Sequence, residues 1–203
     1  MTFSIVTAAI VFGMILPVEL PDKTFIATLV LATRYRPLAV WIGVSLAFLV
    51  QTVVAVTLGG LLGRLPHEPV QILAAVMFLL GGILLLRGAG DADAEGDEAQ
   101  DEFAAKASEP ATGLRAVGAS FLVLFLAEWG DLSQLLTATL AARYKDPWSV
   151  GIGAFAALVV ISGLAAALGR TLLTRLKLST IRRVGGAVCL LLAAITLVEL
   201  VRG

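Results

Sequence analysis

Histidine and cysteine are almost missing from this sequence of 203 residues, which contains one of each, His67 and Cys189. A single cysteine cannot form an intrachain disulfide, and one imidazole with one thiol supplies too few of the ligands that zinc and copper(I) prefer. Charge is scarce as well, since 15% of the residues are charged and 59% are hydrophobic. This composition indicates an integral membrane protein rather than a soluble domain.

The sequence also lacks an excess of positive charge. Lysine and arginine together number 15, aspartate and glutamate together number 15, and the formal net charge is zero. No basic surface is therefore available to hold a nucleic-acid backbone, and nucleic acid is excluded as a partner.

The acidic residues are unevenly distributed, because eight of the fifteen lie between Asp91 and Glu109. The same segment contains one large apolar residue, Phe103. We expect residues 89–113 to form a disordered acidic linker, because they bury too little apolar surface to offset the entropy cost of ordering the chain. Such a linker is a solvated spacer or, as the alternative, a weak cytoplasmic trap for cations.

Hydrophobic residues gather in six runs, each close to the roughly 20 residues that a helix needs to cross a hydrocarbon core of about 30 Å. The first run has no lysine or arginine before Lys23, so we expect it to belong to the mature protein and not to a signal peptide. Short breaks between most of the runs predict neighbouring antiparallel helices. The expected spans are Phe3 to Ala32, Leu38 to Leu62, Val70 to Leu86, Leu114 to Ala141, Ser149 to Leu173 and Ile181 to Val201.

The two halves of the sequence match each other when Glu19 is laid on Glu128. Seven of the eighteen positions from Glu19 to Arg36 are then identical, and two of these identities are acidic residues. Each half holds three spans, so the second half must enter the membrane from the opposite side, as in many secondary transporters. The sequence therefore predicts an all-α polytopic membrane protein with six transmembrane helices in two inverted three-helix repeats, at residues 1–88 and 114–203.

Lysine and arginine also predict the orientation in the membrane. Ten of them fall on the side of the acidic segment and four on the opposite side. Because positive residues are enriched in cytoplasmic loops, the acidic segment is expected in the cytoplasm and both termini outside it.

Four carboxylates lie inside the expected spans. A charged side chain at the bilayer centre costs about 2.5–3.5 kcal/mol, so four of them approach about 12 kcal/mol without compensation. Polar contacts that merely tie helices together stabilise them by about 0.6 kcal/mol on average and are usually made by neutral side chains. The four residues are therefore predicted to form a functional site: Glu19, Asp22, Glu128 and Asp131.

The spacing of these acids favours a cation site. Within each pair the residues are three apart, which places both carboxylates on one face of a helix. A pseudo-twofold axis would bring the two faces together and supply up to eight oxygens. Hard divalent cations such as Ca2+ take about six to eight oxygen ligands, and Mn2+ also suits carboxylates.

Two prolines predict an interruption beside the first acidic pair. Pro17 and Pro21 cannot donate hydrogen bonds to the carbonyls of Gly13 and Pro17. Broken helices at the midplane are where transporters coordinate cations, although a simple proline kink is the alternative. In the second half, Gly130 allows a similar irregularity.

Further polar residues in the spans are candidates for supporting roles. Lys23 can pair with a carboxylate when no metal is bound, or it can extend to the interface as an anchor. Its repeat mate is Leu132, so the site is asymmetric. Cation contact and hydrogen bonding between helices are both open for Thr24, Ser133, Gln51 and the matched pair Thr52 and Ser162.

Clustered carboxylates also explain how transport would be coupled to protons. Like charges in a low-dielectric site favour the protonated form when no metal is present. A divalent cation must displace these protons, so a site exposed to each side in turn exchanges cations for protons.

The segments ELPDKT, from Glu19 to Thr24, and EWGDLS, from Glu128 to Ser133, resemble the duplicated Glu-x-Gly-Asp-Lys/Arg-Thr/Ser signature of the transmembrane protein 165/Gdt family. The resemblance covers both halves and the acidic central segment. It implies a six-helix, two-repeat Ca2+/Mn2+:H+ antiporter.

The resemblance further implies that the motif acids Glu19, Asp22, Glu128 and Asp131 form the cation site, with Thr24 and Ser133 in support. The chain departs from the motif at two positions, because Pro21 stands in place of the glycine and Leu132 in place of the basic residue. These departures leave the four motif acids in place, but ion selectivity and proton coupling can differ from the family pattern.

We therefore expect a proton-coupled exporter of Mn2+ or Ca2+ in a prokaryotic plasma membrane, with no enzymatic activity and no cofactor. The partners expected are the divalent cation, protons and the lipid bilayer, and glycine pairs allow close packing within or between subunits. Three alternatives remain open at this point: an exporter of a small organic solute, a membrane-embedded lipid phosphatase and a scaffold protein.

Overall fold

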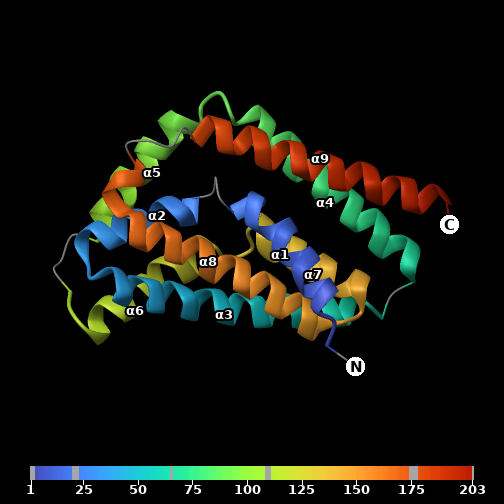
Figure 1. Ribbon diagram of the computed structural model, residues 1–203, viewed down its shortest axis with the longest axis horizontal. Coiled ribbons are helices and arrows are strands. Elements are labelled where there is room, and N and C mark those ends of the chain that lie inside the picture. Colours follow the sequence, from blue (N-terminus) through green and yellow to red (C-terminus); the bar gives the residue numbers. More distant parts are fainter. Residues whose placement is uncertain (1–2, 20–22, 65, 108–110, 174–177, 203) are drawn as a thin grey trace.

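The computed structural model describes residues 3–19, 23–64, 66–107, 111–173 and 178–202. Within these ranges the chain forms nine α-helices and no strand, which confirms the all-helical prediction (Figure 1). The helices are α1 (Ile5–Glu19), α2 (Lys23–Arg34), α3 (Pro37–Leu62), α4 (His67–Arg87), α5 (Ala92–Lys106), α6 (Leu114–Ala127), α7 (Leu132–Tyr144), α8 (Pro147–Leu173) and α9 (Leu178–Arg202).

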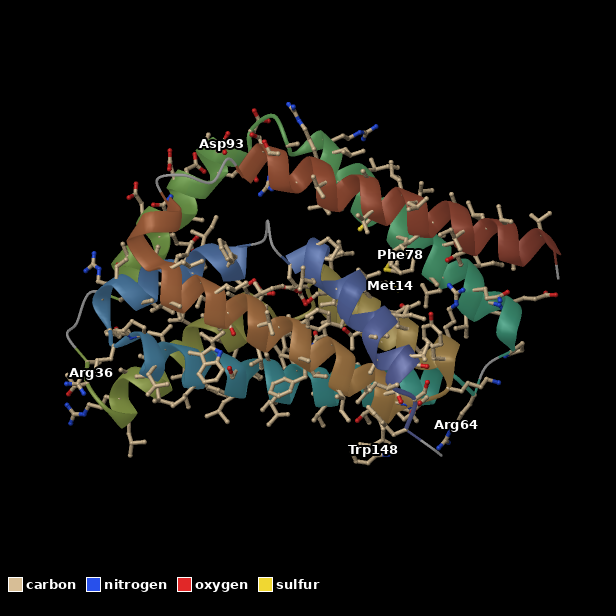
Figure 2. The ribbon with its side chains drawn as sticks, viewed as in Figure 1. Met14, Arg36, Arg64, Phe78, Asp93 and Trp148 are labelled. Carbon is tan, nitrogen blue, oxygen red and sulfur yellow. The ribbon has the colours of Figure 1, made fainter. Side chains whose placement is uncertain are left out.

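Three of these helices, α3, α4 and α8, are long and apolar enough to cross a membrane. Proline occupies the first position of α3 and of α8, where its missing N–H costs no helical hydrogen bond. At about 1.5 Å per residue, the 26 residues of α3 exceed the hydrocarbon thickness of about 30 Å. Arg36 and Arg64, which flank α3, lie at opposite ends of the molecule, as polar ends of a membrane-spanning helix should (Figure 2).

The first and fourth expected spans are each broken into two helices. The pair α1 and α2 is bent by 73° at the break, and the pair α6 and α7 is bent by 74°. If each bent pair counts as one span, the described residues hold up to five spans. The first break follows Glu19, so α1 continues through Pro17, while Pro21 lies outside the described residues. The irregularity predicted at Gly130 is confirmed by its positive φ between α6 and α7.

The helices before and after the acidic segment pack on one another and not in two separate bundles. Both α1 and α2 pack on α8, and both α6 and α7 pack on α3. The contacts are reciprocal: a Cβ at Gly43 of α3 would collide with the carbonyl oxygen of Val117 in α6, and a Cβ at Gly153 of α8 would collide with that of Ala8 in α1. Glycine at these two positions lets the helix backbones approach closely.

The core runs along the facing sides of α3 and α8. Val40, Val44 and Ala47 of α3 are fully buried, and α8 buries Val150, Ala154 and Ala157 at the matching positions of the second half. Large apolar side chains on the outer faces stay exposed, which suits a surface that contacts lipid. The third helices of the two halves, α4 and α9, pack together as an arm beside this body (Figure 1).

The expectation of a disordered acidic linker is wrong, because residues Ala92–Lys106 form the helix α5. Its buried residues recur every three or four positions and face α2 and α9. Alanine and glutamate favour helix, and acidic residues in the first turn with Lys106 in the last complement the helix dipole. Small residues and Phe103 at helical spacing therefore give α5 a face that packs, although the segment as a whole has low hydrophobicity. The buried residues of this face are Ala92, Gly96, Ala99 and Phe103.

Ionic contacts also join α5 to α9. Glu95 Oε2 lies 2.5 Å from Arg182 Nη1, and the same nitrogen donates to the Gly88 carbonyl at 2.9 Å. The Ser179 N–H, in the first turn of α9, donates to Asp93 at 3.4 Å. The acidic segment is thereby held against the beginning of α9.

Candidate cation site

The break between α6 and α7 orients the second pair of acids. Glu128 caps the end of α6, and Gly130 adopts a positive φ of 80°, a conformation that glycine accepts without steric cost. Asp131 then caps the start of α7: its Oδ1 accepts the Gln134 N–H at 3.0 Å, and its Oδ2 accepts the Ser133 N–H at 3.1 Å and the Ser133 hydroxyl at 2.7 Å. Aspartate is a preferred N-cap because it satisfies donors that a helix start leaves unbonded.

The break between α1 and α2 likewise brings polar side chains of the first motif together. Glu19 ends α1, and the Thr24 hydroxyl in the first turn of α2 donates to Glu19 Oε2 at 3.2 Å. On a continuous helix these two side chains would point about 140° apart, so this contact depends on the break. Asp22 lies outside the described residues, and so does the side chain of Lys23.

The two breaks bring three of the predicted acids together. Glu19, Glu128 and Asp131 each offer one carboxylate oxygen, and these oxygens all lie within 4.8 Å of one another. Glu19 is 1% exposed and Glu128 is 3% exposed, while Asp131 is half-buried. Ca2+ binds oxygens at about 2.3–2.6 Å, so ligands on opposite sides of one ion lie up to about 5 Å apart. The spacing therefore fits one hard divalent cation.

The electrostatics of this cluster favour binding of positive charge. Carboxylates a few ångströms apart repel each other, and the repulsion is stronger in a medium of low dielectric constant than in water. Either a divalent cation or protons relieve it. The arrangement of the three carboxylates is therefore suited to a positively charged ligand.

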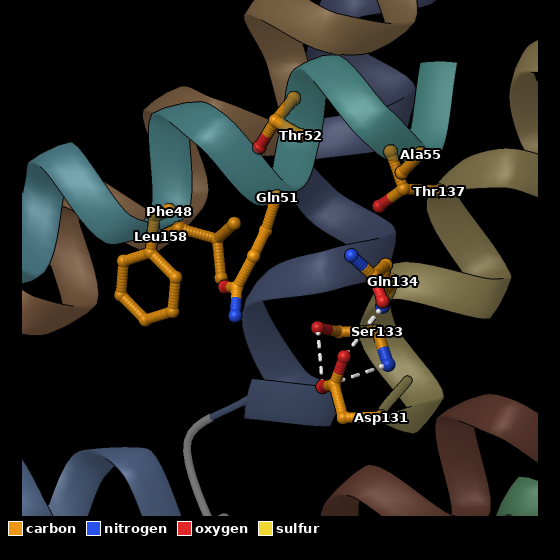
Figure 3. A pocket seen from close by; sticks show the side chains of 9 residues that line it. All are labelled: Phe48, Gln51, Thr52, Ala55, Asp131, Ser133, Gln134, Thr137 and Leu158. Carbon is orange, nitrogen blue, oxygen red and sulfur yellow. Dashed lines mark hydrogen bonds between the residues drawn. The ribbon is translucent and has the colours of Figure 1, made fainter. Parts of the chain in front are cut away.

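A small cavity adjoins Asp131 on the side of α3. Its volume is about 10 Å³, and Asp131 and Ser133 line it together with Gln51 and Thr52 of α3 (Figure 3). Gln51 also donates through Nε2 to the Phe125 carbonyl at 3.3 Å, in the last turn of α6, where carbonyls lack helical partners. Gln51 thus makes a hydrogen bond between two helices, as predicted, and also lines the cavity, while its contact with a cation stays a prediction.

Two further polar residues of the cavity were not among the predicted site residues, namely Gln134 and Thr137 of α7. Gln134 also accepts the Gly130 N–H through Oε1 at 2.8 Å, which closes the turn between the helices. The match between Thr28 and Thr137 in the two halves was the available signal for Thr137. Thr28 itself bonds to the Thr24 carbonyl at 2.8 Å within α2.

A larger, open-sided cavity of about 410 Å³ is lined mainly by the end of α4, with side chains of α1, α5, α7 and α9. Two of its lining residues, Val18 and Leu132, are the chain neighbours of Glu19 and Asp131. Glu95 and Arg182, the ion pair between α5 and α9, line it as well. The basic position of the second motif is thus occupied by an apolar side chain that borders this cavity.

Comparison with known proteins places the chain among membrane transporters. A family model described as divalent cation/proton antiporter GDT1 matches residues 7–93 and 116–203. A GDT1-like protein of Synechocystis sp. is 31% identical over 186 residues, which cover 88% of this chain and 90% of that protein. No solved structure matches the chain.

Plant relatives are longer. Rice GDT1-like protein 1, described as chloroplastic, is 32% identical over 202 residues, which cover 90% of this chain and 59% of that protein. Arabidopsis thaliana GDT1-like protein 3 is 30% identical over 190 residues, with coverages of 86% and 64%. This chain therefore spans less than two thirds of the length of these plant relatives.

Proposed function

The chain belongs to the GDT1 family of divalent cation/proton antiporters, and from this premise we propose that it exchanges Mn2+ or Ca2+ for protons across the membrane. The observation that carries the proposal is the convergence of Glu19, Glu128 and Asp131 at the two helix breaks. Asp22, the repeat mate of Asp131, completes the proposed ligand set. Oxygen ligands of this kind suit Ca2+ and Mn2+ and serve softer metals poorly.

The proposed architecture is six membrane spans in two inverted three-helix repeats. Residues 1–88 form the first repeat, residues 114–203 the second, and the acidic segment 89–113 connects them on the cytoplasmic side. The nearly equal bends of 73° and 74°, and the reciprocal contacts at Gly43 and Gly153, support a twofold relation between the halves. The sixth span in this proposal is α9.

Each carboxylate has a defined task in the proposed mechanism. Thr24 holds Glu19, and Ser133 with the start of α7 holds Asp131, so that the oxygens face a common point. The cation displaces protons from these carboxylates, and protons return when the cation leaves. Lys23 would compensate the negative charge in the metal-free state.

We further propose that the protein exports the cation from the cytoplasm of a prokaryote and lies in the plasma membrane with both termini outside. The cavity that contains Glu95 of α5 together with Val18 and Leu132, the chain neighbours of Glu19 and Asp131, supports an entry route on the side of the acidic helix. The acidic side chains of α5 would raise the local concentration of cations at this entrance.

The test is proton movement in proteoliposomes on addition of Mn2+, Ca2+, Mg2+ or no metal. We expect Mn2+ or Ca2+ to drive proton movement in the parent protein and not in Glu128→Gln, because the substitution removes one of the converging charges. Glu68→Gln is the matched control, since it removes an exposed carboxylate in the first turn of α4, away from the acidic segment. Unchanged exchange in Glu128→Gln would remove the proposed site, and silence of the parent protein to every metal would favour export of an organic solute.

A further inference from the structure

The helices α4 and α9 form a tightly packed pair along one side of the molecule (Figure 1). A Cβ at Gly82 of α4 would lie 3.1 Å from the Gly186 carbonyl oxygen of α9, and a Cβ at Gly186 would lie 3.1 Å from the Gly82 carbonyl oxygen. Arg182 of α9 also donates at 2.9 Å to the carbonyl of Gly88, which caps the end of α4. The α4–α9 arm is therefore built as one unit.

The arm meets the break between α6 and α7 through α4. Gly81, the neighbour of Gly82, faces the body, because a Cβ added there would lie 2.8 Å from Cδ2 of Leu132. Leu132 is the first residue of α7 and follows Asp131, one of the converging acids. Phe78 of α4, one turn before Gly81, is 1% exposed. The helix α4 therefore lays an apolar face beside the second acidic motif.

The arm meets the break between α1 and α2 through α9. A Cβ at Gly185 would lie 2.6 Å from the carbonyl oxygen of Pro17, which stands two residues before Glu19 at the end of α1. This carbonyl has no helical donor, because the residue four positions later is Pro21, which has no N–H. Cys189, one turn after Gly185, is fully buried in the core. The helix α9 therefore covers the backbone beside the first acidic motif.

The junction between the arm and the body contains a cavity near α5 and a polar tie at the other end of α9. The cavity of about 410 Å³ is lined by both helices of the arm together with Val18 of α1 and Leu132 of α7. At the tie, Arg143 Nη1 of α7 donates to the Thr196 hydroxyl of α9 at 2.9 Å. Thr196 lies about 21 Å along α9 from Arg182, at roughly 1.5 Å per residue. This arrangement allows the arm to tilt away from the body at the α5 end.

The charge of the site determines how well the arm packs on the body. Glu19 and Glu128 are almost completely buried, and Asp131 is half-buried. Burial of carboxylates without compensation is costly, whereas a bound divalent cation or protons offset the negative charge. The apolar faces of α4 and α9 therefore pack on the two breaks more favourably when the site is loaded than when it is empty and charged.

We propose that the α4–α9 arm is the gate of the cation site: it closes on the two helix breaks when a divalent cation or protons occupy the carboxylates, and it tilts away at the α5 end when the site is empty. The inference rests on the proposed function. Gly81 and Gly185 are the positions at which the arm rests on the breaks. Because the empty, charged site does not close, it does not cross the membrane without cargo, which makes the exchange of cations for protons obligatory.

The first experiment locks the arm with a disulfide in the full chain that carries Cys189→Ala. A Cβ at Gly81 lies 2.8 Å from Cδ2 and 3.6 Å from Cγ of Leu132, so Gly81→Cys with Leu132→Cys places two thiols within reach of a disulfide. Gly82→Cys with Leu190→Cys is the matched control, because it makes the same kind of link inside the arm. Oxidation of the first pair should abolish Mn2+-driven proton movement in proteoliposomes, and reduction should restore it. The control pair should transport in both states.

The second experiment uses the single cysteine of the parent protein, Cys189, as a reporter. It lies on the same face of α9 as Gly185, so tilting of the arm exposes it. At constant pH, saturating Mn2+ should slow the alkylation of Cys189 by N-ethylmaleimide in the purified parent protein and not in Glu128→Gln. This measurement also decides the proposal if the paired cysteine variants fail to fold.

Three outcomes would overturn the gate. They are full exchange by the oxidised Gly81→Cys, Leu132→Cys protein, equal losses for both cysteine pairs on oxidation, and an alkylation rate of Cys189 that Mn2+ leaves unchanged in a parent protein that exchanges Mn2+ for protons. If the parent protein moved protons in response to no metal, the proposed function would fail instead, so the two failures are distinguishable.

Discussion

Asp131 has two roles that substitutions can separate. Its carboxylate is one of the three that converge, and it also caps α7 by accepting hydrogen bonds from Ser133 and Gln134. Asparagine caps a helix about as well as aspartate, whereas alanine at an N-cap costs about 1 kcal/mol, within a range of roughly 0.5–2 kcal/mol. Asp131→Asn keeps one accepting oxygen for the N–H groups of α7, so it should lose less stability than Asp131→Ala, which should lose about 1 kcal/mol.

Transport should not follow the order of stability, because both substitutions remove the negative charge at the proposed cation site. We expect metal-driven proton movement to be lost in Asp131→Asn as well as in Asp131→Ala. Removal of one of three mutually repelling charges offsets part of the lost stability in both variants, so the retained cap should leave the unfolding temperature of Asp131→Asn above that of Asp131→Ala. The assays are thermal unfolding in detergent and proton movement in proteoliposomes.

Asp146 provides a matched control at another helix start. It precedes Pro147, the first residue of α8, and its Oδ1 accepts the Ser149 N–H at 3.2 Å. Asp146→Ala should cost about the same 1 kcal/mol and leave proton movement intact. Wild-type exchange in Asp131→Asn would refute the reasoning, as would a loss of stability in Asp131→Asn equal to that in Asp131→Ala.

Two further predictions concern packing. Gly43→Ala and Gly153→Ala should each lower the free energy of unfolding by about 1–3 kcal/mol, because an added Cβ meets a backbone carbonyl of the facing helix. Gly60→Ala, where an added Cβ meets nothing within 4 Å, should be neutral or stabilising in the same unfolding assay, and equal effects at all three positions would contradict the close helix contacts. Phe103→Ala should cost about 3 kcal/mol of packing and speed protease cleavage within α5. Glu98→Ala is the control, and unchanged cleavage in Phe103→Ala would show that Phe103 does not hold the helix.

The breaks and the acids were predictable from sequence because each departs from an otherwise apolar run. Proline removes a helical hydrogen bond wherever it stands inside a helix, and a carboxylate in a membrane span is too costly to be incidental. The positions of Glu19, Glu128 and Asp131 follow from these local facts together with the match between the halves. Their roles as ligands remain a proposal.

The remaining features depend on contacts between distant helices. Gln134 and Thr137 face the cavity because α3 happens to lie opposite them, and no local pattern specifies that neighbour. The helix α5 was missed because average composition hides a narrow face of small residues. Thr52 and Ser162 look equivalent in sequence, but the Ser162 hydroxyl donates to the Val159 carbonyl, whereas the Thr52 hydroxyl has no partner among the described residues.

The reciprocal contacts at Gly43 and Gly153 have a consequence for biosynthesis. Val117, against which Gly43 packs, belongs to α6, so the glycine face of α3 lacks this partner until α6 has been synthesised. The helices α1 and α2 likewise lack their packing partner until α8 has been synthesised. Neither half of the chain supplies the whole core or all three converging acids, so the site requires the bent helices of each half to pack on the long helix of the other.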